Sequence, residues 1–258
     1  MRKMARHWIA MLPYYGLVIK LVRKAVAKSN FRKEFEKFKN SSTSGRLVVR
    51  WEDRYPCLND NTKVTGFNRH YVYHPAWAAR ILKQLNPQEH VDIGSSLFFI
   101  SVISAFVRIR FYDYRPAELY LDNLECGSAD LTKLPFKDKT IDSLSCMHVV
   151  EHIGLGRYGD ALDSEGDVKA MRELQRVLKP NGNLLFVVPV GVPRVMFNAH
   201  RIYSFNQIID MFDRLTLMEF SLIEETGNNE PVVGASAEQV SKENYGCGCF
   251  WFQRKEEV

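Results

Sequence analysis

Acidic residues lie at the ends of three short strand-like segments, where they could bind a ligand that carries hydroxyl and amino groups. Asp92 and Gly94 close the first segment, Asp113 closes the second, and Asp130 follows the third. Asp113 comes 19 residues after Gly94, a spacing that suits an acid accepting hydrogen bonds from both hydroxyls of a ribose. Ser95 continues the first loop, whose backbone N–H groups would face the ligand. The spacing predicts a nucleotide-binding sheet, although the first loop alone is equally consistent with a tight turn after a buried strand.

Histidine and glutamate side chains after the fourth strand-like segment could transfer a proton, because histidine is the usual base near neutral pH. Glu151 follows His148 by three residues and His152 follows it by four, so a helical turn would place them on one side. Glu151 could then orient an imidazole. His200, in a separate loop, is a third candidate base. The alternative for His148 and His152 is that they cap or pack the end of the strand.

No metal site is predicted. Cys247 and Cys249 could supply two thiolates, but no second Cys/His pair at zinc spacing accompanies them, and their aromatic neighbours indicate a strand. The acidic segment 160–167 could hold Mg²⁺, although a solvated loop is the simpler interpretation. The glycine-rich segment 154–160 lacks the Lys-Ser/Thr ending of a nucleoside-triphosphate loop and is predicted to be a mobile loop or a lid over an acceptor. Five cysteines without a pairing pattern favour the reducing cytosol.

Helical and strand-like segments alternate from Pro75 onward, which predicts an α/β fold with a doubly wound, mainly parallel, seven-stranded sheet. The predicted strands are short and rich in β-branched or aromatic residues, and they lie at residues 90–94, 107–113, 125–129, 141–147, 183–190, 217–225 and 247–254. The predicted helices lie at residues 75–85, 96–106, 115–122, 166–179 and 204–213.

The charge distribution predicts two parts, a basic N-terminal arm and linker at residues 1–50 and a catalytic domain at residues 51–258. Residues 1–50 hold 13 lysines and arginines against two glutamates, a net charge of +11, whereas residues 51–258 hold 22 basic and 28 acidic residues, a net charge of −6. Because the larger part is acidic, we expect no nucleic-acid partner. Residues 29–50 are polar and charged, a composition that favours a flexible linker.

Residues 1–28 combine lysines and arginines with an apolar run at residues 8–19. Pro13 and Gly16 interrupt this run, and it is too short to cross a bilayer, which takes about 20 residues. It could lie on an anionic inner leaflet, or it could pack on its own domain or on a second subunit of a homo-oligomer. We therefore expect a cytoplasmic protein that is either peripheral at the inner membrane or held to a partner through this segment.

Four motifs together resemble the class I S-adenosylmethionine-dependent methyltransferases, over about residues 70–255. They are Val91-Asp92-Ile93-Gly94-Ser95, Phe111-Tyr112-Asp113, the segment from Gly127 to Phe136 and the segment from Arg172 to Gly182. Two loops, from Glu151 to Asp160 and from Phe197 to Arg201, more narrowly resemble a poorly characterised methyltransferase-like family whose bacterial members are associated with surface-polysaccharide synthesis. The resemblance implies a Rossmann-like methyltransferase fold and S-adenosylmethionine as the cofactor.

The resemblance also implies a role for each residue that matches the motifs. The residues that it places around the cofactor are Asp92, Gly94, Ser95, Asp113, Ala129, Asp130, Leu131 and His148. Within this set, Asp113 would bind the ribose, Asp130 would lie near the adenine amino group, and His148 would face the transferable methyl group. Many class I enzymes have further glycines in the first loop, where this chain continues with Ser96 and bulky residues. A side chain here could narrow the approach of the methionine end.

These features predict methyl transfer to an oxygen of a saccharide or surface-polysaccharide precursor. Such a transfer needs alignment of the acceptor and removal of its proton, for which the candidates are His148, His152, His200 and Glu151. Two alternatives stay open. One is a non-catalytic Rossmann-like binding protein in glycan assembly, and the other is a nicotinamide-dependent sugar-modifying enzyme, although the fingerprint of the latter needs three spaced glycines.

Overall fold

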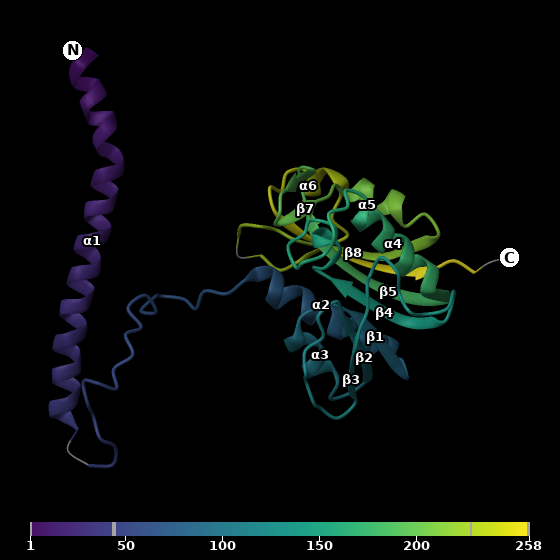
Figure 1. Ribbon diagram of the computed structural model, residues 1–258, viewed down its shortest axis with the longest axis horizontal. Coiled ribbons are helices and arrows are strands. Elements are labelled where there is room, and N and C mark those ends of the chain that lie inside the picture. The colour runs from purple at the N-terminus through teal and green to yellow at the C-terminus, as the bar shows by residue number, and fades with distance from the viewer. Residues whose placement is uncertain (1, 43–44, 228, 257–258) are drawn as a thin grey trace. The chain divides into compact units, whose positions relative to one another are not determined.

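Figure 1 shows the computed structural model, which describes residues 2–42, 45–227 and 229–256. The chain forms two compact units, one up to Gly66 and one from Phe67 onward. Each unit has its own internal contacts, and the two are described separately below.

The first unit contains one long helix, α1, from Arg2 to Ser41. The rings of Phe31 and Phe35 on this helix lie 6.1 and 5.0 Å from the ring of Trp51. The prediction of a flexible linker at residues 29–50 is therefore wrong for the part that α1 includes. Lysine, glutamate and arginine are strong helix formers, and phenylalanines four residues apart share one helix face, so this polar segment is helical.

The predicted membrane-binding segment falls mostly on side chains that lie outside the described part of the structure. These are the side chains of residues 1–18, Lys20 and Arg23. Among the described residues, no helix is both long enough and apolar enough to cross a bilayer. Binding of residues 1–28 to a membrane surface stays a prediction.

The second unit is built on one sheet with the strand order β3-β2-β1-β4-β5-β10-β8-β9. The strands are β1 Glu89–Ile93, β2 Arg108–Asp113, β3 Leu124–Ser128, β4 Ile141–Met147, β5 Leu178–Val190, β8 Leu215–Ile223, β9 Val232–Val233 and β10 Gly246–Arg254. Strands β1 to β5 are parallel, and β10 is antiparallel to its neighbours β5 and β8. All seven predicted strands are present, which confirms the doubly wound, mainly parallel fold, and the two-residue β9 adds an eighth. A separate antiparallel pair, β6 Arg194–Met196 and β7 His200–Ile202, was not predicted.

Helices cover both faces of this sheet (Figure 1). They are α2 Arg69–Leu85, α3 Leu97–Ile103, α4 Gly166–Val177, α5 Phe205–Met211 and α6 Ala237–Ser241, with a single 3₁₀ turn, η1, at Val150–His152. Side chains alternate along β5: Leu184, Phe186 and Val188 pack in a core that includes α4 and α5, whereas Leu185 and Val187 pack in a core that includes α2 and α3. Because both faces are buried, the strand is apolar at every position here and shows no polar alternation.

Helix α2 begins at Arg69, earlier than the predicted start at Pro75. Asn68 caps it, since its side-chain oxygen accepts a hydrogen bond of 3.2 Å from the backbone N–H of Tyr71. Pro75 therefore lies inside the helix. The additional turn carries His70, which is buried with the other core-facing residues of the helix.

The predicted helix at residues 115–122 is absent. Arg115 precedes Pro116, and a residue before proline is disfavoured in the helical conformation. The carboxylate of Asp113 instead accepts a hydrogen bond of 2.7 Å from the backbone N–H of Arg115, so the chain turns directly after β2.

Candidate active site

The carboxyl ends of β1, β2, β3 and β4 border a cavity of about 370 Å³. Most of the residues that the resemblance places around a cofactor line this cavity, namely Gly94, Asp113, Ala129, Asp130, Leu131 and His148. They meet because parallel strands end at the same edge of the sheet, although they are far apart in the sequence. Asp92 and Ser95 are the two predicted cofactor residues that do not line the cavity.

Gly94 is required by both its backbone conformation and its surroundings. Its φ is +70°, and a Cβ atom here would lie 3.0 and 3.1 Å from the two methyl carbons of Val149 and 3.7 Å from Oδ2 of Asp113. The other oxygen of Asp113, Oδ1, accepts the N–H of Arg115. Gly94 and Asp113 both line the first cavity, and Oδ2 of Asp113 is the oxygen that remains for a ligand hydroxyl.

Asp92 and Ser95 hold the first loop in place through buried hydrogen bonds. Asp92 is fully buried, and its two oxygens accept hydrogen bonds from the backbone N–H of Ser95 and from the hydroxyl of Ser145. Ser95 in turn accepts a hydrogen bond of 3.2 Å from the backbone N–H of Met147. Burial raises the pKa of Asp92 to about 6, and the hydrogen bonds from Ser145 and Ser95 act in the opposite direction. Because Ser95 points inward, its side chain does not narrow the cavity.

A second cavity, of about 650 Å³, adjoins the first. Its wall is rich in polar side chains, among them Tyr71, Glu151, His152, Arg157, Asn198, His200 and Tyr245. Gly94, His148, His152 and Tyr158 line both cavities. A group bound in the first cavity can therefore reach the second one across this shared wall.

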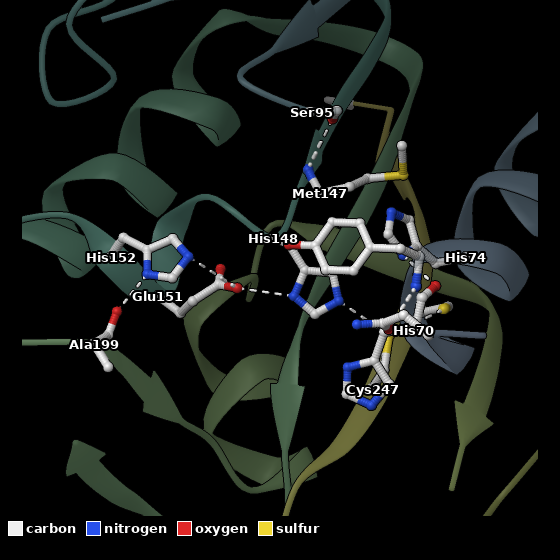
Figure 2. A network of polar contacts seen from close by, with 12 residues as sticks. His70, His74, Ser95, Met147, His148, Glu151, His152, Ala199 and Cys247 are labelled. Carbon is white, nitrogen blue, oxygen red and sulfur yellow. Dashed lines mark hydrogen bonds and ion pairs between the residues drawn. The ribbon is translucent and has the colours of Figure 1, made fainter. Parts of the chain in front are cut away.

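His148 is held on both of its ring nitrogens (Figure 2). Nδ1 lies 2.9 Å from Oε1 of Glu151, and Nε2 lies 3.4 Å from Sγ of Cys247. Burial, with a smaller effect of His200, lowers the pKa of His148 to about 3, and burial raises the pKa of Glu151 to about 7. The imidazole of His148 is therefore neutral, but neither nitrogen is free for an acceptor. This geometry favours the other histidines as the base.

His152 and His200 differ in how many of their ring nitrogens make polar contacts. Nδ1 of His152 donates a hydrogen bond of 2.6 Å to the carbonyl oxygen of Ala199, and Nε2 lies 3.8 Å from Oε1 of Glu151. His200 lines the second cavity, its Nε2 is buried, and neither of its nitrogens hydrogen-bonds to another described residue. Burial lowers the pKa of both histidines. His200 is thus the neutral imidazole of the second cavity whose ring nitrogens have no hydrogen-bond partner among the described residues.

The glycine-rich loop at residues 154–160 surrounds a carboxylate of its own. Asp160 accepts hydrogen bonds of 2.8, 3.3 and 3.1 Å from the backbone N–H groups of Gly154, Gly156 and Tyr158. Asp163 forms a separate ion pair of 2.6 Å with a lysine of α4. Three N–H groups of this loop are therefore engaged by Asp160, and Asp163 is paired with a lysine, so neither a phosphate site nor a Mg²⁺ site is favoured here.

Aromatic residues for which the sequence predicted no role also contact the site. The ring of His148 stacks on those of His70 and Tyr71, with centroids 5.5 and 5.3 Å apart, and His70 also stacks on Tyr245 at 5.1 Å. The signal that could have identified them is Asn68, a capping residue directly before this segment. Starting the helix there places His70 and a second histidine four residues later on one buried face.

Comparison with solved structures identifies the fold of the second unit as that of S-adenosylmethionine-dependent methyltransferases. The Burkholderia thailandensis 1,6-didemethyltoxoflavin N1-methyltransferase, solved with 1,6-didemethyltoxoflavin and S-adenosylhomocysteine, matches with a TM-score of 0.52 and 10% identity over 71% of this chain and 79% of its own. The YcgJ protein of Bacillus subtilis matches with a TM-score of 0.51 and 15% identity over 71% and 99% of the two chains. A Haloferax volcanii putative methyltransferase in complex with the activator Trm112 matches with a TM-score of 0.51 and 19% identity over 73% and 91%. At these identities the likeness concerns the fold.

Two sequence comparisons cover smaller parts of the chain. Residues 132–241 match a family described as a Caenorhabditis protein of unknown function. An uncharacterised protein of Methanocaldococcus jannaschii, MJ0638, is 37% identical over 60 residues, which are 23% of this chain and 21% of that protein. The match thus spans about a fifth of the length of this relative.

Proposed function

We propose that this chain is an S-adenosylmethionine-dependent methyltransferase that acts on a hydroxyl of a saccharide or surface-polysaccharide precursor. The observation that carries the proposal is the pair of adjoining cavities at the carboxyl edge of the sheet, which share Gly94 and His148. S-adenosylmethionine supplies an electrophilic methyl group on a sulfonium. The contribution of the chain is then to hold the acceptor in line with that methyl group and to exclude water.

The residues of the first cavity fit this cofactor. Asp113 lines this cavity, and its Oδ2 is the oxygen that remains for the ribose hydroxyls. Asp130 uses Oδ1 to hold Thr132, through bonds of 2.8 and 2.7 Å, and its other oxygen is available for an amino group. The antiparallel β10 between β5 and β8 departs from the 3-2-1-4-5-6 strand order of nicotinamide-binding sheets, which supports the methyltransferase over that alternative.

The residues of the second cavity fit a hydroxylated acceptor. Its polar wall offers phenol, imidazole, amide and guanidinium groups, which can hydrogen-bond to several hydroxyls at once. Methylation of a hydroxyl needs a base, because the oxygen loses its proton as the new bond forms. The free ring of His200 is the group that we assign to this step, with Glu151 and His152 positioned beside it.

The proposal is tested by measuring cofactor binding and methyl transfer on the full-length chain. We expect saturable S-adenosylmethionine binding in calorimetry, and transfer of an isotopic label from its methyl group to an oxygen of a saccharide acceptor. Asp113→Ala is expected to bind the cofactor about tenfold more weakly, since it loses charged hydrogen bonds to the ribose worth about 1.5 kcal/mol. Asp122→Ala, which changes an exposed acid in the loop after β2, is the matched control and is expected to bind normally.

Two results would contradict the proposal at different levels. Absence of cofactor binding in the unchanged chain would remove the methyltransferase assignment. If S-adenosylmethionine binds but the labelled methyl group is transferred to a nitrogen or sulfur atom, the chain is still a methyltransferase. The proposed acceptor, a saccharide hydroxyl, would then be wrong.

For the N-terminal arm we propose binding to an anionic membrane surface. On the described part of α1, Leu21 and Val26 are 58% and 53% exposed, beside exposed Lys24 and Lys28. Apolar and basic residues on one helix suit the interface of an anionic bilayer. Deletion of residues 1–28 is expected to abolish co-sedimentation with vesicles that contain phosphatidylserine or phosphatidylglycerol, with phosphatidylcholine vesicles as the control. If the full-length chain never sediments with anionic vesicles, the arm is a packing or oligomer element.

A further inference from the structure

We propose that His70, His148 and Cys247 form a binding site for a divalent transition-metal ion of the zinc type. The three residues come from α2, from the turn after β4 and from β10, and Figure 2 shows their side chains converging. All three are buried, and one ligand atom from each lies within 4.8 Å of the others. Among the described residues, no other group of three or more such side chains converges in this way. Imidazole nitrogen and thiolate sulfur are the donors that zinc prefers in proteins.

The separation between the two best-placed donors matches a shared ion. Nε2 of His148 lies 3.4 Å from Sγ of Cys247. A tetrahedral zinc ion with bonds of about 2.0 Å to nitrogen and about 2.3 Å to sulfur places these atoms about 3.5 Å apart. The third donor is farther away, so the ring of His70 would rotate toward the ion when it binds. In the structure this ring stacks on the rings of His148 and Tyr245.

Glu151 gives His148 the surroundings of a metal ligand. A metal-binding histidine commonly donates its second N–H to a carboxylate, which fixes the tautomer and the orientation of the ring. Here Nδ1 of His148 lies 2.9 Å from Oε1 of Glu151, which is 1% exposed. This arrangement directs the lone pair of Nε2 toward Cys247. The buried carboxylate also supplies a negative charge that would offset the charge of an ion.

The backbone of His148 is held in an unusual conformation, and an unsatisfied nitrogen lies nearby. His148 has a φ of +58°, a left-handed conformation that costs a non-glycine residue about 1–2 kcal/mol and that is commonly found at functional sites. His74 is fully buried, its ring lies 5.0 Å from that of His148, and its Nε2 has no hydrogen-bond partner among the described residues. The backbone conformation of His148 is thus typical of a binding site, whereas His74 lies beside the proposed ligands and is not one of them.

Three protein donors leave a position open on a tetrahedral ion. Of the three proposed ligands, His148 lines the second cavity and His70 and Cys247 do not, so the ion would lie behind the wall of the space assigned to the acceptor. Metal binding itself does not depend on methyl transfer, so the two proposals can fail separately.

The test is a titration of the purified full-length chain, stripped with a chelator, with Co²⁺ followed by displacement with Zn²⁺. We expect one equivalent of Co²⁺ to bind, with the visible absorption of a tetrahedral site and a near-ultraviolet thiolate-to-cobalt band. Cys247→Ser is expected to abolish the thiolate band, and His70→Ala to weaken Co²⁺ binding at least tenfold. Glu151→Gln is expected to lower the affinity by about 10- to 100-fold, because it changes only the group that orients His148.

The controls separate this site from other thiols and from misfolding. Cys57→Ser, at an exposed position of the first unit, is expected to leave the titration unchanged. Sγ of Cys249 lies 4.0 Å from Sγ of Cys247, so loss of the band in Cys249→Ser with retention in Cys247→Ser would overturn the ligand set. Thermal unfolding of each variant reports on folding, and His70→Ala carries the test if Cys247→Ser does not fold. No stoichiometric Co²⁺ or Zn²⁺ binding by the unchanged chain would overturn the proposal, whereas calorimetry of the stripped chain with S-adenosylmethionine reports on the methyltransferase independently.

Discussion

Replacement of His200 by alanine is expected to lower turnover by about 10²- to 10⁴-fold, the range that a general base contributes, while affinity for S-adenosylmethionine stays near normal. His200 lines the second cavity, and neither ring nitrogen is hydrogen-bonded to another described residue. Removal of its imidazole leaves the acceptor hydroxyl without a base and does not touch the cofactor cavity, whose lining excludes His200. Single-turnover methyl transfer and calorimetry measure the two effects separately.

The pH dependence identifies the base more specifically than the loss of rate. Burial lowers the pKa of His200 below its usual 6.5, with Arg157 and Arg194 acting in the same direction and Glu151 against it. The imidazole is therefore neutral at pH 7, and protonation on lowering the pH should remove the base, so kcat/KM is expected to fall as the pH drops through a value lower than the usual 6.5 of histidine. The residual activity of His200→Ala should not show this fall of kcat/KM at low pH, the acid limb of the pH profile. If His152→Ala removes the limb and His200→Ala keeps it, the base is His152.

Gly94→Ala is expected to weaken cofactor binding about 100-fold, or about 2.7 kcal/mol. Alanine at a φ of +70° costs about 1–2 kcal/mol, and its Cβ would lie 3.0 and 3.1 Å from the methyl carbons of Val149, which adds about 1–3 kcal/mol of overpacking. The first loop is expected to shift to relieve this strain, and returning it to the conformation that binds the cofactor then costs affinity. The same methyl group would occupy the space that separates the first loop from Asp113. Calorimetry with S-adenosylmethionine measures the loss.

Gly234→Ala is a matched control for this effect. Gly234 has a φ of +71°, and a Cβ atom there would meet nothing within 4 Å. This variant therefore carries the backbone strain without the contact, and it is expected to bind the cofactor normally. In the double variant Gly94→Ala/Val149→Ala, removal of the valine methyl groups should restore part of the affinity. Equal binding by Gly94→Ala and the unchanged chain would show that the cofactor does not approach the first loop.

The sequence predicted the sheet more reliably than the segments around it. The strands of a doubly wound sheet are buried on both faces, so runs such as Leu184 to Val188 are continuous and apolar and can be recognised locally. The segment at residues 115–122 forms no helix, because Arg115 is disfavoured in the helical conformation before Pro116 and its N–H is bound by Asp113. Helix α2 was predicted too short because the start was placed at Pro75, although Asn68 is the capping residue. Because of that error, the histidines in the first turns of α2 were not assigned to the site.

The sequence by itself predicted which residues meet at the first cavity, because Gly94, Asp113 and Asp130 each lie at or just after the end of a strand of a parallel sheet and such strands end at one edge. The tertiary structure alone decided which groups are available for chemistry. His148 and Cys247 are 99 residues apart and meet only because β10 lies beside β5, which in turn lies beside β4. That contact occupies the nitrogen that a base would need, and it brings a thiol to His70. Whether a histidine accepts a proton, holds a metal ion or packs in a core depends on what its two nitrogens face, and residue type and spacing along the chain do not contain that information.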